Sequence, residues 1–232
     1  MSERRRRADA GQVRATERDA LGMSWVVEQY GMPLDLLRKL LGTTDGATRQ
    51  VLMRWRRAGW VETGQRGAGP SWVWATAAGI EAFGRHPYEP HTPSSARVAH
   101  HRAVVAVRLR IEDRWAEKAV TWRSEREMRW ELGQYKGSDA QREHLADGEI
   151  DYDATSGARV RAGIEVELSQ KPFGQLRSNM VAGLDKARTG YVQTWWFVND
   201  RTRALVERAK AETSTPERVL IRELPSDGEV SR

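Results

Sequence analysis

Apolar positions recur at helical spacing through much of the first 84 residues. This spacing predicts three helices, over residues 16–30, 33–41 and about 45–58. Thr44 or Asp45 is placed to cap the third helix, and a glycine follows each predicted helix. WVET and SWVWA then predict two strands joined by the glycine-rich turn GQRGAGP, and residues 77–83 predict a short closing helix.

The apolar pattern stops at RHPYEPHTPSSA, residues 85–96, which holds three of the eight prolines. Proline and polar residues in this density are typical of a connection between domains. We therefore interpret the chain as two domains, residues 12–84 and 97–225, joined by a linker over 85–96. Residues 1–11 are interpreted as a basic disordered arm and residues 226–232 as a tail.

The pattern after the linker predicts a long helix over residues 97–118 and a strand over 119–125. Residues 126–143 are polar, contain glycine and give no clear assignment. HLADGEIDYD and ARVRAGIEVEL predict two strands around ATSG. A helix over 172–188, the apolar strand TGYVQTWWFVN, a helix over 202–211 and the strand RVLIREL follow. This order predicts an α/β (α+β) fold, in which the second domain is a three-layer arrangement with a mixed sheet.

Composition narrows the class of protein. The chain has no cysteine, which excludes disulfide scaffolds and thiolate metal sites. It has no apolar run long enough to span a membrane and no signal-peptide core, so we expect a cytoplasmic protein. The net charge is +6, and residues 1–85 hold 14 Lys and Arg against 9 Asp and Glu. This basic excess at the front favours a polyanionic partner for the first domain.

Three helices followed by a β-hairpin describe a winged helix-turn-helix, a module that places a helix in the major groove of double-stranded DNA. The face of the third helix opposite its apolar stripe carries Thr48, Arg49, Arg56 and Arg57, and the hairpin turn carries Gln65 and Arg66. Arginine suits both guanine and phosphate. The alternatives are a solvated helix face or a winged helix that binds protein rather than DNA.

Acidic residues alternate on the two central strands of the second domain, at 147, 149, 151 and 153 and again at 165 and 167. A two-residue turn at Ser156-Gly157 would turn the two sets to opposite faces. A three-residue loop, Thr155-Ser156-Gly157 with Gly157 left-handed, sets Asp147 opposite Glu165 and is the register we favour. Asp147, Glu165 and Glu167 could then hold one Mg²⁺ or Mn²⁺. Lys171 would then lie near a scissile phosphate. The alternative is that the alternating acidic residues form an ordinary solvated face of the sheet.

Asp147, Glu165-Val-Glu167 and a nearby lysine resemble the active site of PD-(D/E)xK nucleases, which are restriction-endonuclease-like three-layer α/β domains. Ala146 stands where the family has proline, and Glu167 stands where it usually has lysine. The resemblance implies catalytic roles for Asp147, Glu165, Glu167 and Lys171. It implies an accessory acid at Glu112, Glu117 or Glu125. His144 could be a ligand, a base or a structural donor, and His100 and His101 are interpreted as packing or capping residues.

The longer pattern resembles the replication-relaxation family of actinobacterial plasmids and mobile elements. The motifs that carry it are VAHHRAVVAVRLR, SERE (124–127), His144-x-x-Asp147 and EVELSQK (165–171). The resemblance implies a DNA-binding protein with a metal-dependent endonuclease or nickase-like domain. The alternative is a non-catalytic regulator or initiation factor whose nuclease-like domain serves dimerisation or DNA clamping. Winged-helix proteins often form homodimers, but the sequence identifies no interface.

Overall fold

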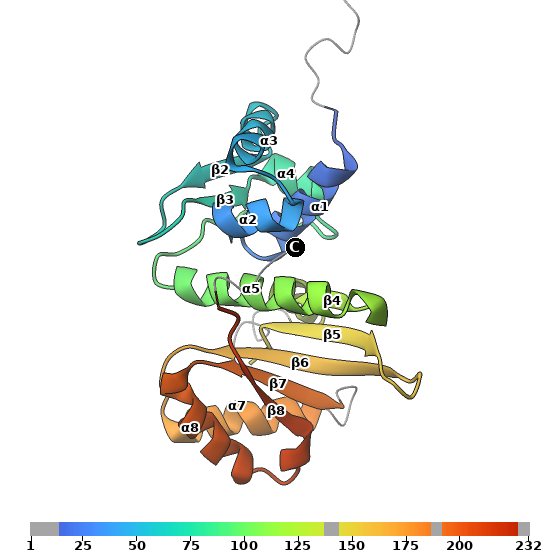
Figure 1. Cartoon of the computed structure of the whole chain (residues 1–232), viewed down its shortest axis with the longest axis vertical. Helices are drawn as coiled ribbons and strands as arrows, with labels where there is room; N and C mark the ends of the chain where they lie inside the picture. Colours follow the sequence, from blue (N-terminus) through green and yellow to red (C-terminus); the bar gives the residue numbers. More distant parts are fainter. Residues whose placement is uncertain (1–13, 137–143, 187–191, 227–232) are drawn as a thin grey trace, which may run out of the picture.

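The structure is a computed structural model that describes residues 14–136, 144–186 and 192–226 (Figure 1). The predicted arm, residues 1–11, and the tail residues 227–232 lie outside this range. The N-terminal half contains α1 (Glu17–Glu28), β1 (Met32–Pro33), α2 (Leu34–Leu41), α3 (Asp45–Arg57), β2 (Val61–Gly64), β3 (Trp72–Ala75) and α4 (Ala77–Phe83). Its three strands form a small antiparallel sheet in the order β1-β3-β2. The strand β1 was not predicted, because it is only two residues long.

Local signals in the sequence set the bounds of the first helices. Thr16 caps α1 in a reciprocal capping box with Asp19, and the Thr44 side chain accepts the N–H of Ala47 at the start of α3. Gly42 ends α2 in the left-handed conformation, with φ of 58°. The predicted helices are therefore confirmed to within a few residues at each end. Trp25 and Trp55 lie fully inside the core that these helices enclose.

The C-terminal half contains α5 (Val98–Arg114), β4 (Thr121–Ser124), α6 (Glu125–Lys136), β5 (Gly148–Asp153), β6 (Arg159–Glu167), α7 (Phe173–Lys186), β7 (Gln193–Val198), α8 (Asp200–Ala211) and β8 (Val219–Glu223). Five strands form one sheet in the order β4-β5-β6-β7-β8. The pairs from β4 to β6 are antiparallel and those from β6 to β8 are parallel. The mixed sheet is confirmed. The helix α6 is new, since residues 126–143 had no assignment; residues 137–143 are outside the described range.

Helices cover both faces of the five-stranded sheet, so this half has three layers (Figure 1). On one face, Val107 and Ile111 of α5 pack with Ile150, Ile164 and Trp195. On the other face, α7 and α8 pack against the sheet through Leu176, Met180, Val206, Trp196 and Val198. Alternation along β6 thus sends Ile164 and Val166 toward α5, as the sequence predicts for a strand.

The helix α5 belongs to both halves of the molecule. Its Val105, Ala106 and Leu109 join the core of the N-terminal half, while Val104, Val107 and Ile111 join the core under the sheet. Figure 1 shows α5 lying between α1 and α2 on one side and the sheet on the other. The two halves are therefore joined by a shared, packed helix as well as by the chain that connects them.

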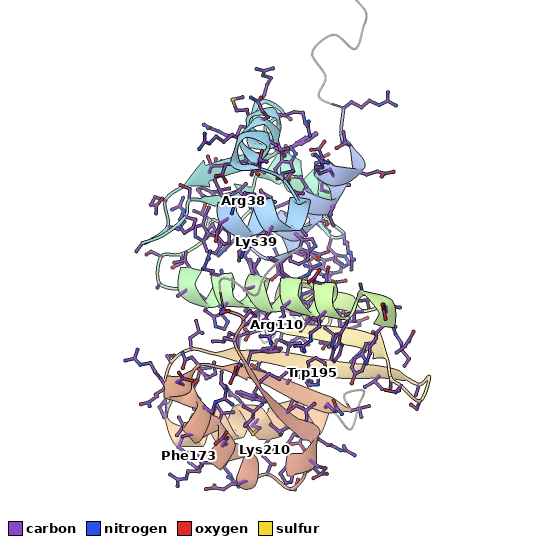
Figure 2. The ribbon with its side chains drawn as sticks, viewed as in Figure 1. Arg38, Lys39, Arg110, Phe173, Trp195 and Lys210 are labelled. Carbon is purple, nitrogen blue, oxygen red and sulfur yellow. The ribbon has the colours of Figure 1, made fainter. Side chains whose placement is uncertain are left out.

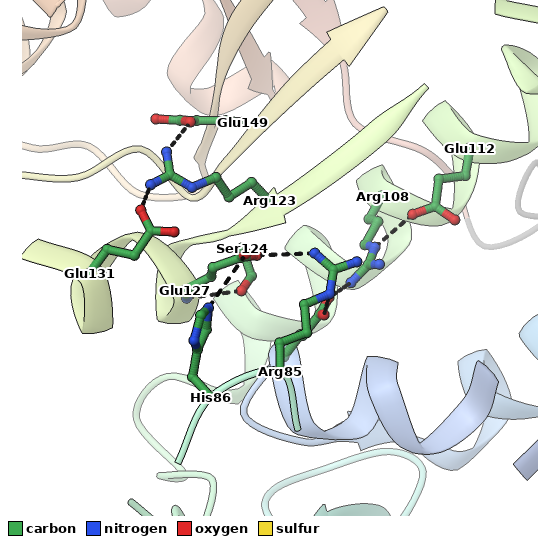
Figure 3. A network of polar contacts seen from close by, with 10 residues as sticks. Arg85, His86, Arg108, Glu112, Arg123, Ser124, Glu127, Glu131 and Glu149 are labelled. Atoms are coloured by element: carbon green, nitrogen blue, oxygen red, sulfur yellow. Dashed lines mark hydrogen bonds and ion pairs between the residues drawn. The ribbon is translucent and has the colours of Figure 1, made fainter. Parts of the chain in front are cut away.

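The predicted linker is packed rather than loose. Residues 84–97 contain no helix or strand, but Tyr88 is buried in the N-terminal core. Arg126 of α6 donates hydrogen bonds to the carbonyl oxygens of Val27 and Glu89. Arg85 contacts both Glu28 and Glu127, and Arg108 contacts Glu28 and Glu112 (Figure 3). These contacts tie α1, α5 and α6 to the connecting segment and fix the orientation of the two halves.

Candidate functional site

A pocket of about 390 Å³ lies at the carboxyl end of β6. The carboxyl end of a parallel strand is where open α/β sheets commonly bind ligands. Its lining carries four carboxylates, three Lys or Arg side chains and two histidines. The lining residues are Arg97, His100, Glu125, Arg129, His144, Leu145, Asp147, Glu165, Glu167, Leu168, Ser169 and Lys171. All four residues that the sequence assigned to catalysis, Asp147, Glu165, Glu167 and Lys171, therefore line one pocket.

The loop between β5 and β6 creates this arrangement. Ala154 and Ala158 close the loop through a 2.9 Å backbone hydrogen bond, and Gly157 has φ of 79°. The loop is Thr155-Ser156-Gly157, as favoured from the sequence, and Gly148 pairs with Ile164. The predicted register is confirmed. It sets Asp147, one residue before β5, beside Glu165.

Asp147 holds the start of β5 against β6. Its Oδ2 accepts the backbone N–H of Val166 at 2.8 Å, and its Oδ1 lies 2.7 Å from Nε2 of His100. His100 comes from α5, so this contact joins α5 to the sheet edge. The interpretation of His100 as a packing or capping residue is wrong, because its ring nitrogen contacts a pocket carboxylate.

Each of the other three carboxylates also has a basic partner. Oε1 of Glu165 lies 2.9 Å from Nε2 of His144, and Oε2 of Glu167 lies 2.7 Å from Nζ of Lys171. Glu125 pairs with Arg129 at 2.6 Å. Lys171 thus reaches back along the chain to Glu167, as predicted. Glu165 and Glu167 on β6 therefore each face a basic side chain of the protein.

Burial changes the protonation of two pocket groups. Removal from water, together with the nearby Asp147 charge, raises the pKa of Glu165, although His144 opposes the shift. Burial acts to lower the pKa of His100, but the hydrogen bond to Asp147 and the negative charge of Asp147 together outweigh burial and raise the pKa above its usual value. The pocket therefore favours a protonated histidine beside Asp147 and disfavours the charged form of Glu165.

The three acids predicted to bind metal do not form a tight ligand cluster. Within the described ranges, the group whose ligand atoms all lie within 4.8 Å of one another is instead His86, Glu127 and Glu131. That group lies near the connecting segment, where Arg85 and Arg123 already pair with its two glutamates (Figure 3). A divalent ion at Asp147 and Glu165 would have to replace His100 and His144 as their partners.

The outer face of α3 carries three of the six residues predicted to bind DNA. Arg49, Arg56 and Arg57 are exposed, and none of them pairs with a carboxylate of the described residues. Thr48 is an exception: it is buried, and its hydroxyl donates to the carbonyl oxygen of Thr44. Its assignment to the exposed face is wrong, because position 48 turns toward the α2–α3 junction.

The hairpin turn uses its predicted side chains internally. The amide nitrogen of Gln65 donates to the carbonyl oxygens of Gly67 and Gly69, at 2.6 and 2.7 Å. The guanidinium of Arg66 lies 4.2 Å from the ring centre of Trp74. Gln65 therefore shapes the turn, and Arg66 is held against β3 with its charge near the surface.

The three acids predicted as accessory residues lie at different places in the structure. Glu125 lines the pocket, but it begins α6 instead of ending a strand. Glu112 does not line the pocket; it pairs with Arg108 at 2.8 Å. The exposed Glu117 lies in a short turn after α5. Arg97, His100 and Arg129 also line the pocket and were not predicted from the sequence. The SERE motif, which contains Glu125, was the available signal for the side of the pocket that α6 forms.

Comparison with known proteins gives no relative for this chain. No family model, curated protein or solved structure matches it. A search for membrane spans over the described ranges finds no helix with the length and apolar character to cross a bilayer. The outer face of α3 and the pocket at β6 therefore carry the evidence on function.

Proposed function

We propose that the chain is a DNA-binding protein in which α3 enters the major groove of double-stranded DNA. The observation that carries this proposal is the set of three exposed, unpaired arginines on α3 within the described residues, Arg49, Arg56 and Arg57. Arg54, which lies on the inner side of the same helix, is by contrast paired with Asp19. Arginines without such partners are available for phosphates and base edges.

The order of elements supports this proposal. The succession α1-β1-α2-α3-β2-β3 matches that of a winged helix-turn-helix, with α3 as the recognition helix and the β2–β3 turn as the wing. Figure 1 shows α3 on the side of its module away from α5 and the large sheet. A duplex could approach α3 without meeting the C-terminal half. A protein-binding winged helix would account less well for three unpaired arginines on one face.

The second candidate function is metal-dependent cleavage of a phosphodiester by the pocket at β6. It is favoured by the register, which brings Asp147 beside Glu165 in a pocket that also holds Lys171 and the exposed Arg97. Carboxylate oxygens suit Mg²⁺ or Mn²⁺, and such an ion would activate water. Every carboxylate of the pocket already has a basic partner. This agrees better with the alternative, in which the C-terminal half is a non-catalytic platform for dimerisation or DNA clamping. The sequence resemblance extends the proposal to DNA of a plasmid or mobile element.

DNA binding is tested by fluorescence anisotropy with a labelled duplex. The Arg49→Ala/Arg56→Ala variant is compared with the wild type and with Arg201→Ala/Arg218→Ala, which removes two exposed arginines from the C-terminal half. Weaker binding of the α3 variant alone supports the proposal. Equal affinity of the two variants would contradict it.

Cleavage is tested separately, by incubating supercoiled DNA with Mg²⁺ or Mn²⁺. Metal-dependent nicking by the wild type that is lost in Glu165→Gln supports the nuclease. Intact DNA with both proteins supports the platform and leaves the assignment of α3 unaffected.

A further inference from the structure

A second pocket, of about 260 Å³, opens between the C-terminal end of α5 and the edge of the sheet at β7 and β8. Figure 2 shows Arg110 on α5 facing the region of Trp195 on the strand below. The lining residues are Arg110, Ile111, Arg114, Trp115, Trp195, Phe197, Ile221, Arg222 and Glu223. It shares no lining residue with the pocket at β6 or with α3.

Aromatic rings form one side of this pocket. Trp115 and Trp195 pack edge to face with ring centres 4.6 Å apart, and Trp195 also approaches Tyr152 at 5.7 Å. Phe197 is buried behind them. These contacts hold the rings in fixed orientations. Trp195 is 1% and Phe197 is 3% exposed, so the partly buried Trp115 is the ring of this group that can contact a ligand.

Arg222 introduces a positive charge that no carboxylate neutralises among the residues that the structure describes. Its guanidinium stacks 4.1 Å from the ring centre of Trp195, which fixes its plane. Its Nε is buried without a hydrogen-bond acceptor, and within the described residues no carboxylate pairs with it. The neighbouring Glu223 is instead paired with Arg203 at 3.2 Å. A half-buried cation without a carboxylate partner leaves the pocket suited to an anionic ligand.

Two further arginines, Arg110 and Arg114, line this second pocket. Arg110 donates to the carbonyl oxygen of Glu223, and Arg114 is exposed at the end of α5. Burial lowers the pKa of Arg222, and the positive charges of Arg114 and Arg110 lower it further, although Tyr152 opposes the shift. Arg114 and Arg222 therefore place two positive charges beside Trp115.

We propose that this pocket binds an unpaired nucleotide, with the base against Trp115 and the Arg222 plane and the phosphate on Arg114 at the mouth of the pocket. Bases stack on aromatic side chains and on guanidinium planes. Arginine binds phosphate through paired N–H groups. A volume of about 260 Å³ lies just below the range of about 300–1,000 Å³ that drug-sized ligands occupy, which suits one base with its phosphate at the mouth. The nucleotide can be free or part of a single strand.

The test is isothermal titration calorimetry of the full chain with deoxyadenosine monophosphate, deoxyadenosine and inorganic phosphate. The mononucleotide should bind more tightly than either of its parts. Arg114→Glu should lower its affinity about tenfold or more, the scale of a charge-assisted contact. Arg222→Lys, which keeps the charge and removes the planar fork, should also weaken binding. Arg201→Glu is the matched control on α8 and should leave the affinity within about twofold.

A deoxyadenosine tetranucleotide separates the two sources of the ligand. Tighter binding of the tetranucleotide than of the mononucleotide assigns the pocket to single-stranded DNA, and equal binding assigns it to a free nucleotide. Three results would overturn the proposal: neither probe binds, phosphate binds as tightly as the mononucleotide, or Arg114→Glu behaves like Arg201→Glu. The Arg49→Ala/Arg56→Ala variant should keep mononucleotide binding, so failure of the α3 proposal would leave this one standing.

Discussion

Asp35 of α2 and Arg102 of α5 form a two-point ion pair across the boundary between the halves of the molecule. Nη1 of Arg102 lies 2.8 Å from Oδ1 of Asp35, and Nη2 lies 2.7 Å from Oδ2. Both side chains are 27% exposed, so solvent screens the pair less than it screens a surface contact. The pair fixes α2 on the side of α5 that faces away from the sheet.

Asp35→Asn should lower the free energy of unfolding by about 2 kcal/mol at neutral pH, the usual scale for a charged hydrogen bond. Burial acts to raise the pKa of Asp35, but the Arg102 contact outweighs it and the pKa is lowered from 3.8. A lowered pKa stabilises the fold above the unfolded value and loses this effect as pH falls through the folded value. Urea unfolding at several pH values should therefore show the two proteins converging as the pH falls below the usual aspartate pKa of about 3.9.

The matched control for this pair is Asp153→Asn. Asp153 pairs with Arg159 at 3.0 Å, but the side chains are 52% and 43% exposed. An exposed pair of this kind contributes only about 0–1 kcal/mol. A loss at Asp35 no larger than the loss at Asp153 would contradict a structural role for the contact between the halves.

Local patterns predicted most elements and one register, because the residues that decide them are adjacent in the chain. Gly157 illustrates this: a left-handed glycine after Thr155-Ser156 fixes the loop, and the loop fixes which residues face each other. The helix α6 gave no such signal. Its buried first turns include Arg126 and Glu127 beside Met128, so polar side chains held by distant partners interrupt the apolar pattern. Apolar periodicity cannot find a helix of that kind.

The pocket at β6 was predicted only in part, for a similar reason. Asp147, Glu165 and Lys171 lie on or beside one hairpin, so strand alternation and loop length were sufficient to bring them together. His100 reaches Asp147 from a helix 47 residues away in the chain. No spacing rule connects the two. The dual packing of α5 was also hidden, since a helix buried on two sides loses the single apolar stripe that marks a helix with one solvent face.

If the arginines of α3 contact DNA phosphates, replacing them should change how DNA affinity depends on salt concentration. Replacing Arg49 and Arg56 with alanine should weaken binding to any duplex and reduce the slope of log affinity against log salt by about 2, if each arginine neutralises one phosphate. Anisotropy titrations over a range of salt concentrations measure this slope. If the slope is unchanged in this variant and also in Arg201→Ala/Arg218→Ala, α3 does not contact the DNA.

Gly148 at the start of β5 should tolerate no side chain. A Cβ at this position would lie 2.2 Å from Cζ2 of Trp122, a ring buried between α5 and the sheet. Gly148→Ala should therefore destabilise the fold by about 1–3 kcal/mol, as overpacking of a core does. Because Gly148 directly follows Asp147, the substitution should also disturb the pocket.

Gly133 of α6 is the control for that substitution, because a Cβ there meets no atom within 4 Å. Gly133→Ala should stabilise the fold by about 0.5–1 kcal/mol, since alanine is the better helix former. Thermal unfolding of the two variants should move the melting temperature in opposite directions. Destabilisation by both would contradict the specific role of the Trp122 contact.

Arg108 is a deeply buried cation between the halves, and its loss should be costly. Its side chain is 7% exposed, its guanidinium lies 3.8 Å from the ring centre of Trp25, and its Nη1 lies 3.1 Å from Oε2 of Glu28. Arg108→Met should lower the free energy of unfolding by about 3–5 kcal/mol, because the 2% exposed Glu28 loses a buried partner. Arg85 still contacts Glu28 at 3.2 Å, which places the loss toward the lower end.

A second substitution separates the lost charge pair from lost packing. Adding Glu28→Gln to Arg108→Met removes the buried charge that the first change strands, so the double variant should regain about 1–3 kcal/mol relative to Arg108→Met alone. Urea unfolding of the wild type, both single variants and the double variant completes the cycle. No recovery would mean that the packing of Arg108 on Trp25 carries the effect. Full recovery would mean that the halves are held by apolar contacts through α5, with the ion pair selecting their orientation.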